Sequence, residues 1–149
     1  MRAAQRAAAT RLQRLYYELL SFKVGRRSTL RRFFSPPPVP RGVYFWGGVG
    51  RGKSFLMDCF FDSVPYRRKK RIHFHAFMHG VHQQLNQLKG ESDPLLRVAE
   101  RIATEVRLLC FDEFHVSDIA DAMILGRLLD ALFEVFLERL TEDYAHYTF

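Results

Sequence analysis

The feature that most constrains the fold is a glycine-rich stretch that directly follows an apolar run. Residues 43–46 read Val-Tyr-Phe-Trp, and residues 47–54 read Gly-Gly-Val-Gly-Arg-Gly-Lys-Ser. A strand, a loop of the form G-x-x-x-x-G-K-S and a helix, in that order, make up a P-loop. The sequence therefore predicts a site for a nucleoside triphosphate.

Each residue type in this loop suits phosphate binding. Glycine at positions 47, 50 and 52 would let backbone amides turn toward phosphate oxygens. The ammonium group of Lys53 would reach the outer phosphates, and the Ser54 hydroxyl would bind Mg²⁺ in the first turn of the next helix. The predicted binding residues are Gly47, Gly48, Val49, Gly50, Arg51, Gly52, Lys53 and Ser54.

Two carboxylates form the second candidate part of the site. Asp112 and Glu113 follow the apolar residues 108–111, as expected where a buried strand ends at a nucleotide cleft. Asp112 would hold Mg²⁺ with Ser54, directly or through water, and Glu113 would orient or deprotonate the water that attacks the terminal phosphate. Solvated acids at an ordinary strand end are the alternative, and the P-loop upstream favours the functional interpretation.

The apolar periodicity predicts alternating strands and helices. A parallel sheet with helices on both faces, joined by right-handed crossovers, is the expected α/β architecture. A basic helical arm and a Pro-rich connector precede it in residues 1–40. Strands are expected at residues 43–46, 72–77 and 107–111, and helices at residues 7–22, 54–62, 80–88, 94–105 and 118–133.

Composition and charge narrow the class of protein. The chain has 149 residues, 48% of them hydrophobic, without an apolar run that would span a bilayer, so we expect one soluble domain that is not secreted. The net charge of +7 is concentrated in residues 1–35, which hold nine Arg or Lys against Glu18 alone. An organelle transit peptide is an alternative interpretation of that segment. A second basic cluster, residues 67–71, could contact nucleic acid or acidic lipid, but a solvated loop is preferred.

Two cysteines and two aspartates are assigned structural roles. Cys59 and Cys110 lie among bulky apolar residues, so we expect buried thiols in a reducing compartment. Asp118 and Asp121 could extend the acidic part of the site, but capping of the following helix is preferred.

Four histidines could be imagined as metal ligands. His73 and His75 would share one face of the predicted strand, and His79 and His82 follow. Their spacing fits no familiar metal site, so packed strand residues are the preferred interpretation, with one or two facing the nucleotide as the alternative.

Three longer stretches occur in a fixed order. Residues 41–46 read Arg-Gly-Val-Tyr-Phe-Trp, residues 73–78 read His-Phe-His-Ala-Phe-Met, and residues 110–122 read Cys-Phe-Asp-Glu-Phe-His-Val-Ser-Asp-Ile-Ala-Asp-Ala. Together they resemble the ZapE cell-division ATPases of bacteria and their mitochondrial AFG-type relatives. Residues 12–16 also resemble the family's N-terminal helix, which argues against a transit peptide over that part of the arm.

This resemblance implies an AAA+-like P-loop ATPase that uses ATP and Mg²⁺ to remodel protein partners. Those partners would belong to the division ring in bacteria or to quality control at the mitochondrial inner membrane. The resemblance implies that Lys53 and Ser54 serve the phosphates and Mg²⁺, and that Asp112 and Glu113 bind Mg²⁺ and activate water. It also allows a homo-oligomer and a bacterial cytoplasmic location, with a mitochondrial one as the alternative. Nucleic acid is not an expected partner.

The chain departs from the family pattern after residue 133. Family members continue with a strand that carries a polar sensor residue and with an arginine that reaches a neighbouring subunit, and residues 134–149 show neither. We therefore expect a partial ATPase core at residues 41–133 and a tail outside the family pattern, as in a truncated or misread frame. Neither Arg127 nor Arg139 is assigned as the missing arginine, so binding of ATP is expected more firmly than efficient hydrolysis.

An ATPase of this type is the leading functional hypothesis. The alternative is a catalytically silent nucleotide-binding or protein-interaction fragment, in which the basic arm and the amphipathic helices contact partners. A small P-loop kinase is a third hypothesis. The Asp112-Glu113 pair argues against it, because two acids favour water over an acceptor substrate as the nucleophile, and no arginine-rich lid follows.

Overall fold

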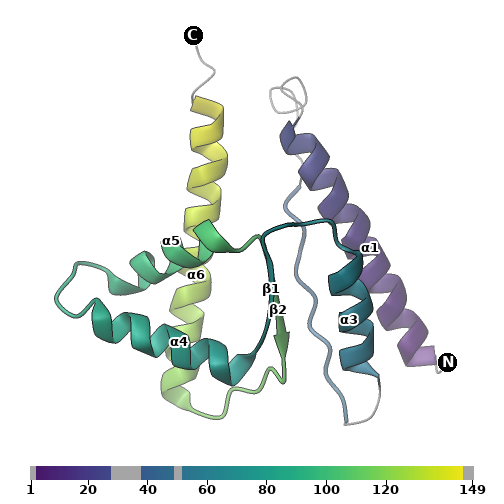
Figure 1. Ribbon diagram of the computed structural model, residues 1–149, viewed down its shortest axis with the longest axis horizontal. Coiled ribbons are helices and arrows are strands. Elements are labelled where there is room, and N and C mark those ends of the chain that lie inside the picture. The colour runs from purple at the N-terminus through teal and green to yellow at the C-terminus, as the bar shows by residue number, and fades with distance from the viewer. Residues whose placement is uncertain (1–2, 28–37, 49–51, 146–149) are drawn as a thin grey trace. The chain divides into compact units, whose positions relative to one another are not determined.

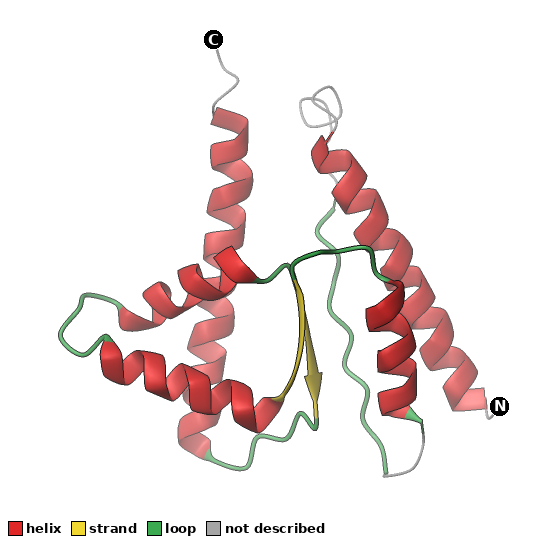
Figure 2. Cartoon of the chain, in the orientation of Figure 1, coloured by secondary structure: helices red, strands yellow, loops and turns green. Residues whose placement is uncertain are grey.

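The computed structural model of the protein describes residues 3–27, 38–48 and 52–145, with side chains described for residues 3–25, 38–48 and 52–135. The chain divides into two compact units, Met1–Pro65 and Tyr66–Phe149, and each is described by itself. Figure 2 shows that helices dominate the described chain and that its two strands lie side by side. None of the described helices combines the length and the apolar character needed to cross a membrane.

The first unit is built on a long N-terminal helix. This helix, α1 (Ala3–Arg27), packs along α3 (Lys53–Ser63), as Figure 1 shows. Leu15, Leu19 and Phe22 are buried at helical spacing. The amphipathic helix predicted at residues 7–22 is therefore confirmed, and so is the helix predicted after the P-loop.

Two basic side chains of α1 contact other parts of this unit. Arg11 Nη2 donates to the carbonyl oxygen of Arg41 at 3.3 Å, and Lys23 Nζ donates to the carbonyl oxygen of Pro65 at 2.6 Å. The arm is thus a helix folded onto its unit, and part of its positive charge serves internal hydrogen bonds.

The strand predicted at residues 43–46 is not formed. Residues 38–48 contain neither helix nor strand, and Tyr44 and Trp46 are 63% and 86% exposed. A strand needs a neighbour that satisfies its backbone amides and carbonyls, and none of the described strands pairs with this segment. The chain therefore reaches the P-loop through a connection without sheet hydrogen bonds.

As far as it is described, the second unit contains two parallel strands and three helices. The strands pair from Lys69 opposite Leu108 to His73 opposite Asp112, so their carboxyl ends meet at one edge. Together with the helix that follows the P-loop, this pair confirms an α/β P-loop fold in partial form. The elements are β1 (Lys69–His73), α4 (Phe74–Gln87), α5 (Pro94–Glu105), β2 (Leu108–Asp112) and α6 (Ile119–Ala145).

The strand predicted at residues 72–77 is wrong in its position. β1 ends at His73, and α4 starts at the next residue. Phe74, Met78 and Val81 are 3%, 2% and 1% exposed, and their i, i+4, i+7 spacing places them on one face of a helix. Burial of this helical face outweighs the strand propensity of a short aromatic run.

The solvated loop predicted for the basic cluster at residues 67–71 holds only for its first two residues, which are exposed and precede β1. Its last three residues lie in β1. Arg68 Nη1 donates to the carbonyl oxygen of Thr104 at 3.0 Å, and the Arg68 carbonyl accepts from the amides of Arg107 at 2.6 Å and Leu108 at 3.2 Å. Backbone pairing with β2 thus determines where these charges lie.

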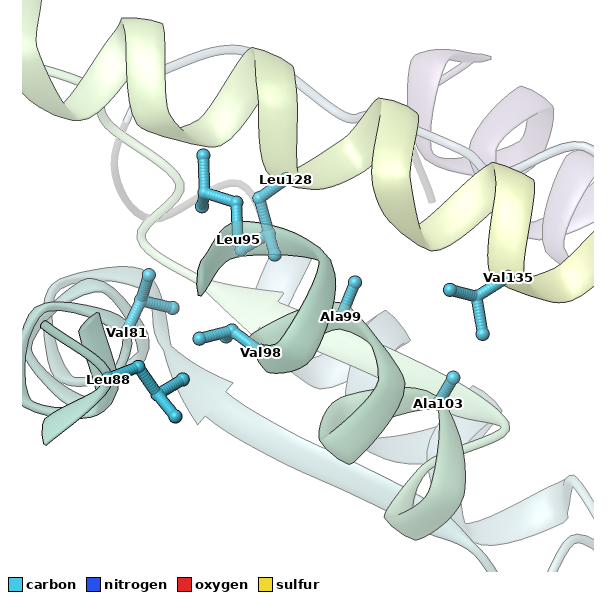
Figure 3. Packing of buried hydrophobic residues seen from close by; sticks show 8 residues of the cluster. All are labelled: Val81, Leu88, Leu95, Val98, Ala99, Ala103, Leu128 and Val135. Carbon is cyan, nitrogen blue, oxygen red and sulfur yellow. The ribbon is translucent and has the colours of Figure 1, made fainter. Parts of the chain in front are cut away.

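Helix α5 forms the middle of the hydrophobic core, as predicted from its start at Pro94. Asp93 Oδ1 accepts from the Leu96 amide at 3.2 Å and caps the helix, and Pro94 occupies its first turn. Figure 3 shows the side chains of α5 between those of α4 and α6. The buried cluster consists of Val81, Leu88, Leu95, Val98, Ala99, Ala103, Leu128 and Val135.

Helix α6 begins as predicted and runs further. Asp118 Oδ1 accepts from the Ala120 amide at 2.8 Å, which confirms the capping interpretation for Asp118. The helix continues to Ala145. It therefore passes the domain boundary predicted at residue 133, which stays a prediction.

The two cysteines lie in different environments. Cys110 in β2 is buried, and burial raises the pKa of its thiol to about 11. Cys59 in α3 is exposed, so the prediction of a buried thiol is wrong at this position. Phe60 is the buried residue of this short helix, and the neighbouring position turns toward solvent.

We expect Leu128→Ala to lower the free energy of unfolding by about 2–4 kcal/mol, because it empties a fully buried position between helices. Leu129→Ala is the matched control, because Leu129 is 50% exposed. It should lose less than about 1 kcal/mol. Chemical denaturation followed by circular dichroism measures both losses. Equal losses would contradict the orientation of α6.

We expect a thiol reagent at about pH 8 to label Cys59 and to spare Cys110 in the folded protein. A buried thiol with a pKa of about 11 holds almost no thiolate at that pH. Peptide mapping by mass spectrometry locates the label, and unfolding should expose both sites. Cys59→Ser should abolish labelling of the folded protein. Rapid modification of Cys110 before unfolding would contradict its burial.

Candidate functional site

The P-loop is described at its two ends. Gly47 has a φ of 142° and Gly52 a φ of 77°, conformations that favour glycine. Lys53 Nζ donates hydrogen bonds to the carbonyl oxygens of Gly47 at 2.6 Å and of Gly48 at 2.8 Å. The ammonium group thus contacts the start of its own loop. The remaining predicted binding residues, Val49, Gly50 and Arg51, lie outside the described residues.

Among the described residues, no side chain caps the N-terminus of α3. Its N-cap residue is Gly52, and its first turn holds no acidic residue. The first helical hydrogen bond runs from the Leu56 amide to the carbonyl oxygen of Gly52, at 3.1 Å. The amides ahead of Leu56 have no partner within the helix, and Ser54 is exposed. These groups fit a phosphate with Mg²⁺, because amides and the helix dipole favour an anion and a hydroxyl oxygen suits this cation.

The second candidate part of the site lies where the strands of the second unit end. We call Asp112 and Glu113 the acidic edge. Asp112 is the last residue of β2 and stands opposite His73, the last residue of β1. Parallel pairing therefore brings the carboxylates and this imidazole to one end of the sheet, as the polar pattern of the sequence predicts for Asp112 and Glu113.

Arg71 is the partner of Asp112 in the structure. Its Nε lies 2.6 Å from Oδ2 and its Nη2 lies 3.1 Å from Oδ1. The hydrogen bond to Asp112 raises the pKa of Arg71, although burial acts in the opposite direction. No motif in the sequence indicated Arg71 as a site residue. The contact depends on the strand register, which places Arg71 opposite Cys110 and so on the same face as Asp112.

Glu113 has an unusual backbone conformation. Its φ is 51°, in the left-handed region that a non-glycine residue rarely adopts. Its side chain is 86% exposed, and Oε2 lies 3.9 Å from His73 Nδ1. Such backbone strain costs about 1–3 kcal/mol and is found where surrounding packing imposes it. The turn ends the strand and directs this carboxylate toward solvent, where water can reach it.

Aromatic rings supply the packing on both sides of Glu113. The ring centroids of Phe111 and Phe114 lie 5.8 Å and 4.5 Å from that of Phe74, and Phe77 lies 4.8 Å from Phe111. Phe74 and Phe77 belong to α4, which directly follows β1. The residues that flank Glu113 are therefore anchored to the helix that begins at the same edge of the sheet.

The preferred interpretation of the histidines as packed strand residues is wrong for His75, which lies in a helix and is exposed. Because α4 begins at Phe74, His75 is helical and does not share a strand face with His73. His82 Nε2 lies 2.7 Å from Asp121 Oδ1 and connects α4 to α6, so the carboxylate of Asp121 contacts a histidine instead of capping a backbone amide. Within the described ranges, no three His, Cys, Asp or Glu side chains gather as a metal site would require.

The P-loop belongs to the first unit and the acidic edge to the second. The structure describes each by itself. The predicted sharing of one Mg²⁺ by Ser54 and Asp112 therefore stays a prediction.

Comparison with known proteins identifies relatives that match most of the chain. The sequence matches the family model for the AFG1-like ATPases over residues 1–137. It is 48% identical over 141 residues to the cell division protein ZapE of Escherichia coli K12, a match that covers 87% of this chain. It is also 48% identical over 111 residues to lactation elevated protein 1 homolog B of Danio rerio, covering 67% of this chain. No solved structure gives a significant match.

Each match covers a large share of this chain but a small share of the relative. The chain spans 37% of the length of the bacterial relative and 22% of that of the Danio rerio relative. The resemblance inferred from the three sequence stretches is confirmed by the family match, which extends over most of the chain. On this evidence, the protein belongs to the AFG1-like ATPase family.

Proposed function

We propose that the protein binds ATP with Mg²⁺ at its P-loop and, like an ATPase of its family, hydrolyses the terminal phosphoanhydride bond. The observation that supports this most directly is the position of Lys53, whose ammonium group contacts Gly47 and Gly48 beside an uncapped helix N-terminus. A phosphate oxygen carries more negative charge than a peptide carbonyl. Arriving phosphates can therefore replace these carbonyls as partners of the lysine.

The acidic edge supplies the remaining roles in this proposal. Mg²⁺, when bound, would neutralise charge on the phosphate oxygens, and Ser54 and Asp112 would provide its protein ligands. Glu113 would accept a proton from water as the water oxygen bonds to the terminal phosphorus and the bridging bond to ADP breaks. The high exposure of Glu113 and its strained backbone support this role, because the carboxylate is held where water reaches it.

Protein partners are the proposed targets of this activity. The Escherichia coli relative is named as a cell division protein, which supports a role in bacterial cell division. We propose that this role is the remodelling of proteins by an AAA+-like assembly of several copies in the bacterial cytoplasm, as the family resemblance implies. A mitochondrial setting is the alternative, because eukaryotic relatives such as the Danio rerio protein also match. We do not propose nucleic acid as a partner.

A second candidate is nucleotide binding without turnover. The pairing of both Asp112 oxygens with Arg71 favours it, because the guanidinium charge beside this carboxylate opposes the approach of a metal ion. Phosphate release from ATP by concentrated purified protein separates the two candidates. Release above the background of Lys53→Ala supports hydrolysis, and binding without release supports the silent alternative.

We expect Lys53→Ala to weaken ATP affinity by about tenfold or more, because the substitution removes the charge that meets the phosphates. Fluorescence anisotropy of a labelled ATP analogue with Mg²⁺ measures the affinity. Lys89→Ala is the matched control, since Lys89 is exposed and lies in the second unit. Equal affinities of wild type and Lys53→Ala would remove the P-loop assignment.

We expect Glu113→Gln to keep ATP affinity within about threefold and to lower the rate of phosphate release by about 10²-fold or more. The amide keeps the shape of the side chain but cannot take a proton from water. Glu105→Gln, an exposed acid at the end of α5, serves as the control and should turn over normally. Single-turnover phosphate release measures the rate. An unchanged rate in Glu113→Gln would refute the assigned role.

A further inference from the structure

Arg71 has no role in the function proposed above, yet it makes the strongest polar contact at the acidic edge. One guanidinium group donates to both carboxylate oxygens of Asp112, at 2.6 Å and 3.1 Å. Two hydrogen bonds from a rigid fork fix the plane of a carboxylate as well as its position. The orientation of Asp112 is therefore set by this one side chain.

The contact is part of the sheet and not a chance meeting of surface chains. In the strand register Arg71 stands opposite Cys110, and Asp112 is the next residue of β2 on the same face. The side chains of Arg71 and Asp112 are only 28% and 12% exposed. A pair that is shielded in this way is screened less by salt than an exposed one.

In this arrangement the guanidinium group of Arg71 and a divalent metal ion would both bind the carboxylate of Asp112. A divalent cation binds carboxylate oxygens, and here both oxygens already accept hydrogen bonds from a positive group. A metal at Asp112 would have to share the carboxylate with Arg71 and would stand close to the positive charge of the guanidinium group. The negative phosphates of bound ATP would reduce that repulsion. A metal ion that binds without a nucleotide would meet the full repulsion from Arg71.

We propose that Arg71 is a positioning residue that competes with Mg²⁺ for Asp112, so that metal binding at this carboxylate requires the charge of the nucleotide. The inference rests on the role proposed for Asp112 as a metal ligand. It assigns to Arg71 the role of orienting Asp112. Arg71 would also raise the Mg²⁺ concentration at which Asp112 binds the metal.

The direct test is the Mg²⁺ concentration that gives half-maximal binding of a fluorescent ATP analogue. Arg71→Ala should lower this concentration by about fivefold, as expected for the loss of one partly buried competing charge. Lys70→Ala is the matched control, because it removes a positive charge from the neighbouring, exposed position of β1. It should stay within about twofold of wild type. An unchanged or higher Mg²⁺ requirement in Arg71→Ala would overturn the competition.

Variants of Asp112 separate failure of this inference from failure of the proposed function. If Asp112→Ala leaves the Mg²⁺ requirement unchanged, Asp112 is not a metal ligand and the proposed function loses that role. If Asp112→Ala raises the requirement, the double variant with Arg71→Ala should match Asp112→Ala alone. A further fivefold drop in the double variant would mean that Arg71 acts as a general charge and not through Asp112.

Two further measurements keep the test decisive. Titration of the protein with Mn²⁺ alone, followed by electron paramagnetic resonance of the unbound ion, should show weak binding in wild type and tighter binding in Arg71→Ala. Equal binding would count against competition even if no nucleotide bound. Should Arg71→Ala unfold, Arg71→Lys replaces it. A lysine keeps the charge but cannot hold both oxygens, so a smaller shift in the same direction is expected and an absent shift overturns the proposal.

Discussion

The parallel pairing of β1 with β2 is the constraint on which the acidic edge depends. In this register, His73 stands opposite Asp112 and Arg71 opposite Cys110. An antiparallel pair, or a slip by one residue, would turn Asp112 away from Arg71 and separate Glu113 from His73. The connection enforces the parallel direction, because α4 begins directly after β1 and α5 ends just before β2. Both ends of the strand pair are thus tied to helices.

Those helices in turn depend on burial between them. The side chains of α5 lie between α4 and α6 in Figure 3, and Val98, Ala99 and Leu128 are completely buried there. At the other end of α4, Phe74 packs against Phe111 and Phe114, which bracket the acidic residues. The unusual φ of Glu113 is stable because these rings hold the chain on both sides of it. Helix α4 therefore contributes both to the main buried cluster and to the separate cluster beside the acidic edge.

Periodicity and capping predicted the helices better than the strands. The starts of α5 and α6 follow from Asp93, Pro94 and Asp118, whose roles are local in the chain. The segment at residues 43–46 has a strand-like sequence, but a strand also needs a hydrogen-bonded neighbour, which local sequence does not reveal. The strand predicted to continue after His73 is wrong for a related reason. Burial against other elements favours a helix there over a strand.

In the candidate site, too, residues of a contiguous motif could be predicted from the sequence. A residue that strand pairing brings close could not. Gly47, Gly52 and Lys53 could be identified because the motif is contiguous, and their conformations and contacts agree with it. Arg71 could not, because nothing in the order of residues says that it lies beside Asp112. That contact appears only once the register of the strands is known.

Both candidate parts of the site hold their charges in contact with the protein itself. Lys53 donates to two loop carbonyls, and Asp112 accepts from Arg71. An ammonium or a carboxylate left without a partner in a partly buried position would be costly, so each charge is satisfied before any ligand arrives. Binding of a charged ligand then replaces one hydrogen-bonding partner of the side chain by another. The free energy of this exchange is the difference between the state bonded to the protein and the state bonded to the ligand. The lysine gives up neutral carbonyls, whereas the aspartate gives up a cation held by two hydrogen bonds. The exchange at Asp112 is therefore the more demanding of the two.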